Sequence, residues 1–120
     1  MDRERGRPHG VGVNRGDIVV AATSGPYTNK PRPVLVVQAD VFNDIHASVT
    51  VCPITSTSLD AALFRVPLPP GTRTGLREPS QVMVDKVITV PRRAIGKTVG
   101  QCSAEELHAV GDALRYWLDL

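Results

Sequence analysis

The chain has 120 residues, enough for one domain with a sizeable core but not for two. Its composition is 42% hydrophobic and 22% charged, with a formal net charge of +2, as in ordinary globular proteins. No apolar run approaches the roughly 18 residues of a membrane-spanning helix, so we expect a cytoplasmic protein with no membrane association.

Two features of the composition, few aromatic residues and many turn formers, limit the kinds of core and secondary structure that we expect. Aromatic residues make up 4% of the chain, so we expect a core of Val, Ile, Leu and Ala. Ten prolines and ten glycines indicate many turns, which suit short strands better than long helices. Cys52 and Cys102 lie far apart without metal-ligand spacing, which predicts two reduced thiols, no metal site and no cofactor.

The first 14 residues mix arginines and acids with Gly and Pro and show no periodicity. We predict a flexible basic tail over residues 1–14 and a single domain over residues 15–120. Arg15-Gly16-Asp17 has the composition of a turn, and the β-branched run after it predicts a first strand over residues 18–22.

A loop over residues 23–31 follows, rich in turn formers and longer than a tight hairpin needs. Loops held over a rigid sheet often carry binding residues. A nucleic-acid base could stack on Tyr27, and a phosphate could meet Lys30, with Asn29 beside them. The alternative is that all three are solvated loop residues without a role.

The two most informative stretches are the next two apolar runs, which predict strands over residues 33–39 and 48–54. Arg32 stands at the mouth of the first run between Pro31 and Pro33, which limit its backbone freedom. Thr55 and Ser56 stand where the second run ends. If the strands are neighbours, a guanidinium and a hydroxyl face one pocket, suited to a phosphodiester. The alternatives are an arginine that caps carbonyl groups and a threonine that forms a turn.

The second half of the chain predicts further short strands, over residues 64–68, 81–90 and, at an edge, within 91–101. A basic irregular connection carries Arg73 and Arg77, which either extend a positive groove or are solvated. The apolar face of the strand over 81–90 changes register at Asp85-Lys86, which predicts a bulge or sharp bend. Asp85 is better suited to anchor that bend through hydrogen bonds than to act as a base.

The chain ends in a predicted helix. Ser103 and Glu106 form a capping-box pattern, and Leu107, Val110 and Leu114 with Trp117 or Leu118 follow at helical spacing. Gly111 lies on the apolar side, where it would permit close packing. The predicted elements together indicate a mainly β protein, a small, strongly bent antiparallel barrel with a C-terminal helix.

At this point the motifs resemble the MazF/PemK/Kid family of toxin endoribonucleases. The matching segments are, in order, Arg15-Gly16-Asp17-Ile18, Arg32-Pro33-Val34-Leu35-Val36-Val37, Pro53-Ile54-Thr55-Ser56, Gly75-Leu76, Ser80, Asp85-Lys86-Val87, Gly96-Lys97-Thr98-Val99-Gly100 and Ser103-Ala104-Glu105-Glu106-Leu107. Each motif is weak alone, but their order and the chain length agree over about residues 15 to 118.

The resemblance implies an SH3-like barrel of the MazF/CcdB type, a homodimer, and metal-independent cleavage of single-stranded RNA. The expected products are a 2′,3′-cyclic phosphate and a 5′-hydroxyl. A MazE-like antitoxin is the implied partner, with a tail that blocks the RNA groove. The family's essential arginine falls on Arg32, its catalytic threonine on Thr55, and its strand aspartate on Asp85.

The sequence also departs from the family pattern. The first loop, residues 24–30, has no acid, Met83 stands where some relatives have arginine, and no loop histidine lies near the first strand. The resemblance therefore does not identify the general acid and base. Two other functions stay open, a CcdB-like gyrase-binding toxin and a non-catalytic SH3-like binding module. The pairing of Arg32 with Thr55 argues against the gyrase binder, which has no use for a phosphate pocket.

Overall fold

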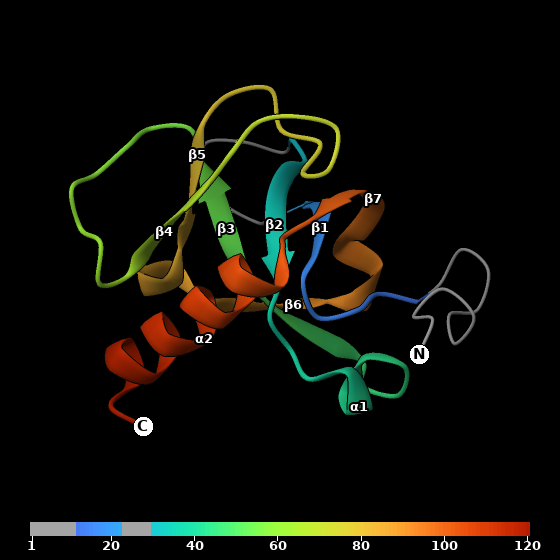
Figure 1. The fold of residues 1–120 in the computed structure, drawn as a ribbon. Helices are drawn as coiled ribbons and strands as arrows, with labels where there is room; N and C mark the ends of the chain where they lie inside the picture. The colour runs from blue at the N-terminus through green and yellow to red at the C-terminus, as the bar shows by residue number, and fades with distance from the viewer. Residues whose placement is uncertain (1–11, 23–29) are drawn as a thin grey trace.

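The computed structural model describes residues 12–22 and 30–120, and it is built around a seven-stranded antiparallel sheet (Figure 1). Tyr27, Asn29 and most of the predicted N-terminal tail lie outside the described residues. The elements are β1 Asp17–Ala21, β2 Arg32–Val36, α1 Asp40–Asn43, β3 Ser48–Thr55, β4 Arg65–Leu68, β5 Ser80–Met83, the 3-10 turn η1 Val84–Lys86, β6 Ile88–Pro91, the 3-10 turn η2 Arg92–Ala94, β7 Ile95–Gln101 and α2 Ala104–Leu118.

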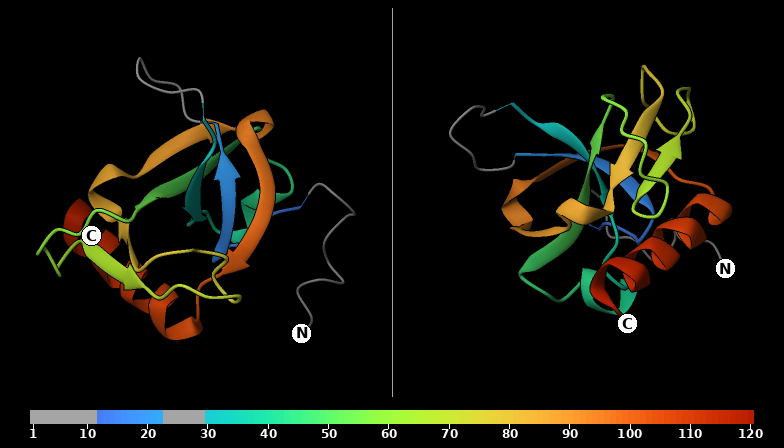
Figure 2. Two further views of the ribbon diagram at one scale, coloured as in Figure 1. Left: turned by 90° about the horizontal axis from the view of Figure 1, so that it is seen from above. Right: turned by 90° about the vertical axis from the view of Figure 1, so that its left-hand side faces the viewer.

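The strand order is β4-β5-β3-β2-β1-β7, and β6 pairs with β3 outside this path. One edge of β3 is therefore shared: its first half pairs with β6 and its last two residues pair with β5. Seen from above, the strands curve around a common interior (Figure 2). The predicted mainly β architecture with a C-terminal helix is confirmed, although the sheet does not close into a complete barrel.

The predicted single strand over residues 81–90 is wrong, but the bend expected at Asp85-Lys86 is present. The chain leaves β5 through η1, closed by a hydrogen bond from Val87 N–H to the Val84 carbonyl, and re-enters the sheet as β6. This turn carries the chain from the end of β3 to its beginning. The two charged residues that interrupt the apolar pattern thus mark the point where the chain crosses from the end of β3 to its beginning.

Two aliphatic clusters lie on opposite faces of the central strands, because successive side chains of a strand alternate between faces. The first includes Ile18, Leu35, Cys52 and Val82, and α2 adds Val110 to it. The second, on the other face, consists of Val13, Val19, Ala21, Val34, Val36, Val49, Val51 and Val90. Val13 is 5% exposed, so core packing begins two residues before the predicted domain start at Arg15.

Helix α2 begins with the predicted capping box, in which Ser103 Oγ accepts from Glu106 N–H and the Glu106 carboxylate accepts from Ser103 N–H. The helix lies across one face of the sheet (Figure 1), and Val110 and Ala113 are its buried residues. Trp117 packs against Phe64 with ring centroids 5.2 Å apart and stays 45% exposed. Trp117, placed on the apolar stripe of the helix from sequence, is therefore only partly covered within one chain.

Gly100 in β7 allows the loop over residues 69–79 to touch the sheet. A Cβ added at Gly100 would lie 2.2 Å from the backbone carbonyl atoms of Thr74, far inside van der Waals contact. Gly111 is different, because a Cβ there would make only ordinary contacts with two side-chain ends, Arg15 Nη2 at 3.6 Å and Arg115 Nη1 at 3.9 Å. The close packing predicted for Gly111 is thus not needed.

We expect Gly100→Ala to lower the free energy of unfolding by about 2–3 kcal/mol, because backbone must move to admit the methyl group. Gly111→Ala should raise it by up to about 1 kcal/mol, since alanine has the better helix propensity. Urea denaturation of both variants measures the difference. An unchanged midpoint for Gly100→Ala would show that loop and strand do not touch.

Candidate functional site

The register between β2 and β3 sets the two predicted catalytic residues at the same end of two neighbouring strands. The pairs are Val36 with Val51, Leu35 with Cys52, and Val34 with Pro53. Continuing this register by two positions sets Arg32 opposite Thr55. Opposed residues of antiparallel strands project to the same face, so the guanidinium and the hydroxyl stand on one side of the sheet, at the rim of the second aliphatic cluster.

Arg32 is exposed at the first position of β2, where it pairs with Ala21 of β1. Within the described part of the chain, no hydrogen bond or ion pair engages its guanidinium. Arg65, Arg73 and Arg115, in contrast, each bind a carboxylate. Arg32 is thus an uncommitted cation with donors free to bind an anion.

Thr55 is half-buried, and its Oγ1 accepts a hydrogen bond of 3.1 Å from Thr57 N–H. The turn-forming role considered from sequence is therefore present. It leaves the hydroxyl proton free to be donated, because the bond uses only a lone pair. Ser56, the next residue, is exposed in the same turn.

The sequence interpretation assigned no role to Gln81, which the structure places in the site. Gln81 pairs with Thr55 across β5 and β3. Its side-chain amide binds the backbone of Leu59 twice, accepting from Leu59 N–H and donating to the Leu59 carbonyl, both at 3.0 Å. The only sign of this role in the sequence is a single glutamine in an otherwise apolar strand. Its hydrogen-bond partner could not be identified, because that partner lies 22 residues away.

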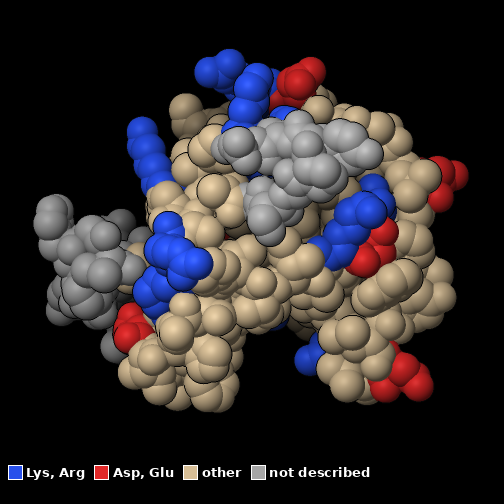
Figure 3. All heavy atoms as spheres, turned by 180° about the vertical axis from the view of Figure 1, so that it is seen from behind, with Lys and Arg blue, Asp and Glu red and all other residues tan. Residues whose placement is uncertain are grey.

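The other residues that were predicted to contact RNA are spread over the surface. Lys30 is exposed two residues before Arg32, at the same end of the sheet, and Arg77 is exposed in the loop before β5. In the view from behind, Lys and Arg side chains lie in several separate places instead of one continuous patch (Figure 3). The face seen in this view therefore offers a polyanion several separate positive charges and no continuous basic surface.

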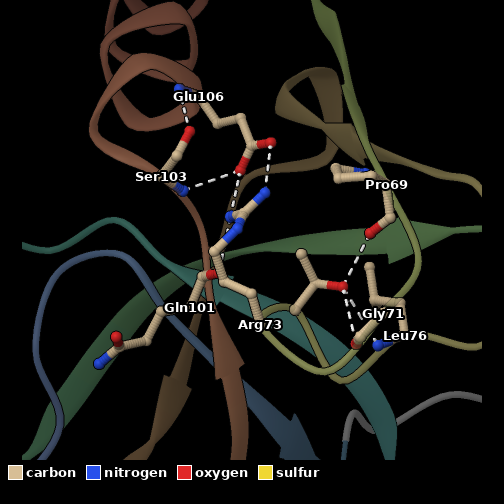
Figure 4. A network of polar contacts seen from close by, with 8 residues as sticks. Pro69, Gly71, Arg73, Leu76, Gln101, Ser103 and Glu106 are labelled. Atoms are coloured by element: carbon tan, nitrogen blue, oxygen red, sulfur yellow. Dashed lines mark hydrogen bonds and ion pairs between the residues drawn. The ribbon is translucent and has the colours of Figure 1, made fainter.

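Arg73 is held inside the protein's own network (Figure 4). Its guanidinium donates to both carboxylate oxygens of Glu106, at 2.9 and 3.1 Å, and to the Gln101 carbonyl at 3.1 Å. These bonds hold the pKa of Glu106 below its usual value. Gln101 pairs with Asp17 at the beginning of β1, whereas Arg32 pairs with Ala21 at its end. Arg73, which binds Gln101, therefore lies at the other end of β1 from Arg32.

Asp85 forms a two-bond ion pair with Arg65, at 2.7 and 3.0 Å, and the side chains are only 15% and 9% exposed. The hydrogen bonds from Arg65 lower the pKa of Asp85 below its ordinary value of 3.8. A carboxylate of lowered pKa is a weak base, and this one fastens η1 to β4. The pairing was missed from sequence because Arg65 lies inside an apolar strand pattern.

Other kinds of site find no support in the described ranges. Residues 12–22 and 30–120 contain no group of three His, Cys, Asp or Glu side chains placed to hold a metal ion. None of the helices in this part of the chain has the length and apolar content to cross a membrane. A shallow groove of about 330 Å³ between α2 and β4 is lined by none of the predicted catalytic residues.

Comparison with known proteins identifies the class to which this fold and site belong. The model of the PemK-like, MazF-like toxins of type II toxin–antitoxin systems matches residues 14–118. A relative named probable endoribonuclease MazF, from Mycolicibacterium smegmatis, is 44% identical over 108 residues, which cover 90% of this chain and 98% of that protein. The chain therefore belongs to the PemK-like, MazF-like toxin family, which confirms the resemblance seen in the sequence.

Solved structures agree with this assignment. Mycobacterium tuberculosis toxin MazF-mt6 superposes with a TM-score of 0.74 at 32% identity, over 87% of this chain and 97% of that one. A structure described as an endoribonuclease in complex with its cognate antitoxin, from a mycobacterial species, gives a TM-score of 0.75 at 21% identity and covers 90% of this chain and 96% of that chain. The second match supports the fold alone.

Proposed function

We propose that the protein is the toxin of a type II toxin–antitoxin system and acts in the cytoplasm as an endoribonuclease on single-stranded RNA. The observation that carries the proposal is the uncommitted guanidinium of Arg32, set by register opposite Thr55 on one face of the sheet. Family membership and the relatives named endoribonucleases support the same activity.

The proposed reaction needs no metal, because the RNA supplies its own nucleophile. The 2′-oxygen forms a bond to phosphorus as its proton departs, and the bond from phosphorus to the 5′-oxygen breaks as that oxygen gains a proton. The products are a 2′,3′-cyclic phosphate and a 5′-hydroxyl. Arg32 donates to the non-bridging oxygens, whose negative charge grows in the transition state. Thr55 donates to the phosphate or orients the 2′-hydroxyl.

The surrounding residues have graded roles in this proposal. Lys30 and Ser56 stand beside the reactive pair and contact the RNA backbone, and Arg77 extends the positive surface. Tyr27 and Asn29 are proposed contacts from sequence alone. Arg73 and Asp85 act through structure, since each already binds an oppositely charged side chain.

A homodimer and a MazE-like antitoxin complete the proposal. Membership of the family of type II toxin–antitoxin toxins supports such a partner. Exposed apolar side chains near the end of α2, Tyr116, Trp117, Leu118 and Leu120, supply a surface for assembly. The tail of the antitoxin would cover the face that carries Arg32 and so exclude RNA.

Incubation of the purified protein with a long single-stranded RNA in EDTA tests the activity. We expect discrete fragments that end in 2′,3′-cyclic phosphates, because no step needs a divalent ion. A parallel assay of DNA gyrase covers the alternative toxin class. Intact RNA together with poisoned gyrase would overturn the proposal, and intact RNA with active gyrase would favour a non-catalytic binding module.

Thr55→Ala should slow RNA cleavage by about 10-fold to 100-fold, since one hydroxyl donor to the phosphate is lost. The urea midpoint should change little, because the lost turn bond is solvent-accessible. Single-turnover cleavage of a defined RNA measures the effect, and Thr55→Ser should keep most of the rate. Unchanged cleavage in Thr55→Ala would remove Thr55 from the site.

A further inference from the structure

The segment that follows Thr55 is held down by one side chain. We call residues 56–60 the Thr55 loop. Gln81 binds its backbone through both halves of the amide, accepting from Leu59 N–H and donating to the Leu59 carbonyl at 3.0 Å each. The planar amide thus forms with Leu59 a two-bond contact like a step of a β-ladder. At its other end, the loop is tied by the Thr57 N–H bond to Thr55 Oγ1.

Strand register fixes the side of the sheet on which this contact lies. Gln81 pairs directly with Thr55, so the two side chains project to the same face. Arg32 projects there too, from the next strand along. The row therefore runs Gln81, Thr55, Arg32 across β5, β3 and β2, and the Thr55 loop folds back over its Gln81 end.

The loop offers a contact surface in spite of being tied down. Ser56, Thr57 and Ser58 are exposed, and the Leu59 side chain is 49% exposed although its backbone makes both bonds to Gln81. An apolar side chain on a fixed backbone next to polar hydroxyls is suited to a nucleobase, which has an apolar face and a polar edge. The wall of the site beside Thr55 is thus rigid and chemically mixed.

We propose that Gln81 is a positioning and specificity-determining residue, which holds the Thr55 loop as the wall against which the RNA base next to the cut phosphate is selected. The inference rests on the proposed ribonuclease activity and adds the origin of its base preference. Gln81 touches neither phosphate nor 2′-hydroxyl, and it acts through the loop. When it is lost, the RNA backbone still meets Arg32 and Thr55, but the base beside the phosphate meets a movable wall.

The chain contains a matched control for this contact. Gln38 forms a similar two-way contact at the opposite end of β3, where Oε1 accepts from Thr50 N–H at 3.1 Å and Nε2 donates to the Ser48 carbonyl at 3.2 Å. Its amide is likewise half-buried. Because Gln38 Nε2 also donates to Asn43 Oδ1 at 3.0 Å, removing this side chain costs one hydrogen bond more than removing Gln81 does, but it leaves the Thr55 loop in place.

The experiment compares wild type, Gln81→Ala, Gln81→Glu and Gln38→Ala on a pool of short RNAs with randomised bases around one cut site. Gln81→Glu keeps the length of the side chain and the bond from Leu59 N–H but loses the donor to the Leu59 carbonyl. Fragment sequencing gives the base preference, and steady-state kinetics on the preferred RNA separates KM from kcat. Urea midpoints confirm that each variant is folded.

We expect both Gln81 variants to flatten the base preference by about 10-fold and to raise KM more than they lower kcat, as when one recognition contact is lost. Gln38→Ala should keep the wild-type preference. If Gln81 and Gln38 variants share the wild-type preference and KM, the inference is wrong even though the enzyme cleaves RNA. If the wild type leaves RNA intact, the proposed function fails, and this inference fails with it.

Discussion

Arg32→Ala should abolish most RNA cleavage, with a rate about 10²-fold to 10³-fold lower, the usual cost of removing one preorganised donor from a developing oxyanion. The guanidinium is exposed, and it makes no hydrogen bond or ion pair with any residue of the ranges 12–22 and 30–120. The free energy of unfolding should therefore stay within about 0.5 kcal/mol of wild type. Single-turnover cleavage and urea denaturation measure the two quantities.

Two variants sharpen this prediction. Arg32→Lys keeps the charge but loses the forked donors, so it should recover binding of RNA more than the rate of cleavage. Arg115→Ala removes an exposed arginine on α2 that pairs with Asp112, and should cleave at the wild-type rate. Cleavage by Arg32→Ala within twofold of wild type would move the reactive site elsewhere on the molecule.

Asp85→Ala should lower the free energy of unfolding by about 2–3 kcal/mol near pH 7. It leaves Arg65, whose side chain is 9% exposed, without its carboxylate partner. Breaking a fully buried pair costs about 3–5 kcal/mol, and contact with solvent reduces the cost here. Adding Arg65→Met to Asp85→Ala should recover most of the loss, since no unpaired cation is left behind. Asp112→Ala, which breaks an exposed pair, should cost under about 0.5 kcal/mol.

The same ion pair predicts an acid dependence of stability. The pKa of Asp85 in the folded protein lies below its ordinary value of 3.8, because Arg65 stabilises the ionised form. The contribution of the pair is therefore complete above that ordinary value and is lost as the pH falls through the lower pKa of the folded state. Urea titrations from about pH 7 to about pH 3 should show wild type approaching Asp85→Ala. A stability difference that does not change with pH would exclude the carboxylate as its source.

Sequence patterns predicted the local features of this protein better than its long-range pairings. The capping box of α2, the apolar runs of β2 and β3, and the bend at Asp85-Lys86 follow from neighbouring residues, and the structure has all of them. The nearness of Arg32 and Thr55 depended on strand register, which the runs did not encode, because both faces of these strands are buried and no polar alternation marks their register.

The residues that sequence reasoning missed share one property, a polar partner about twenty residues away. Arg65 bonds to Asp85 and Gln81 bonds to Leu59. In each case a residue of a paired strand reaches a partner that lies just beyond the end of the neighbouring strand. For Arg73 the sequence left open a positive groove or a solvated side chain, because the sequence does not show that Glu106 lies near it. Composition reveals a charge, whereas only topology reveals whether that charge is already neutralised.

The divided edge of β3 has a consequence for how such toxins diversify. Its first half is paired with β6, while its last two residues are paired with β5, next to the segment that leads to β4. Residues 56–60 of that outer segment belong to neither aliphatic cluster. Under the proposed function, exchange of this short stretch would change the surface that meets the RNA and leave the interior packing of the scaffold intact.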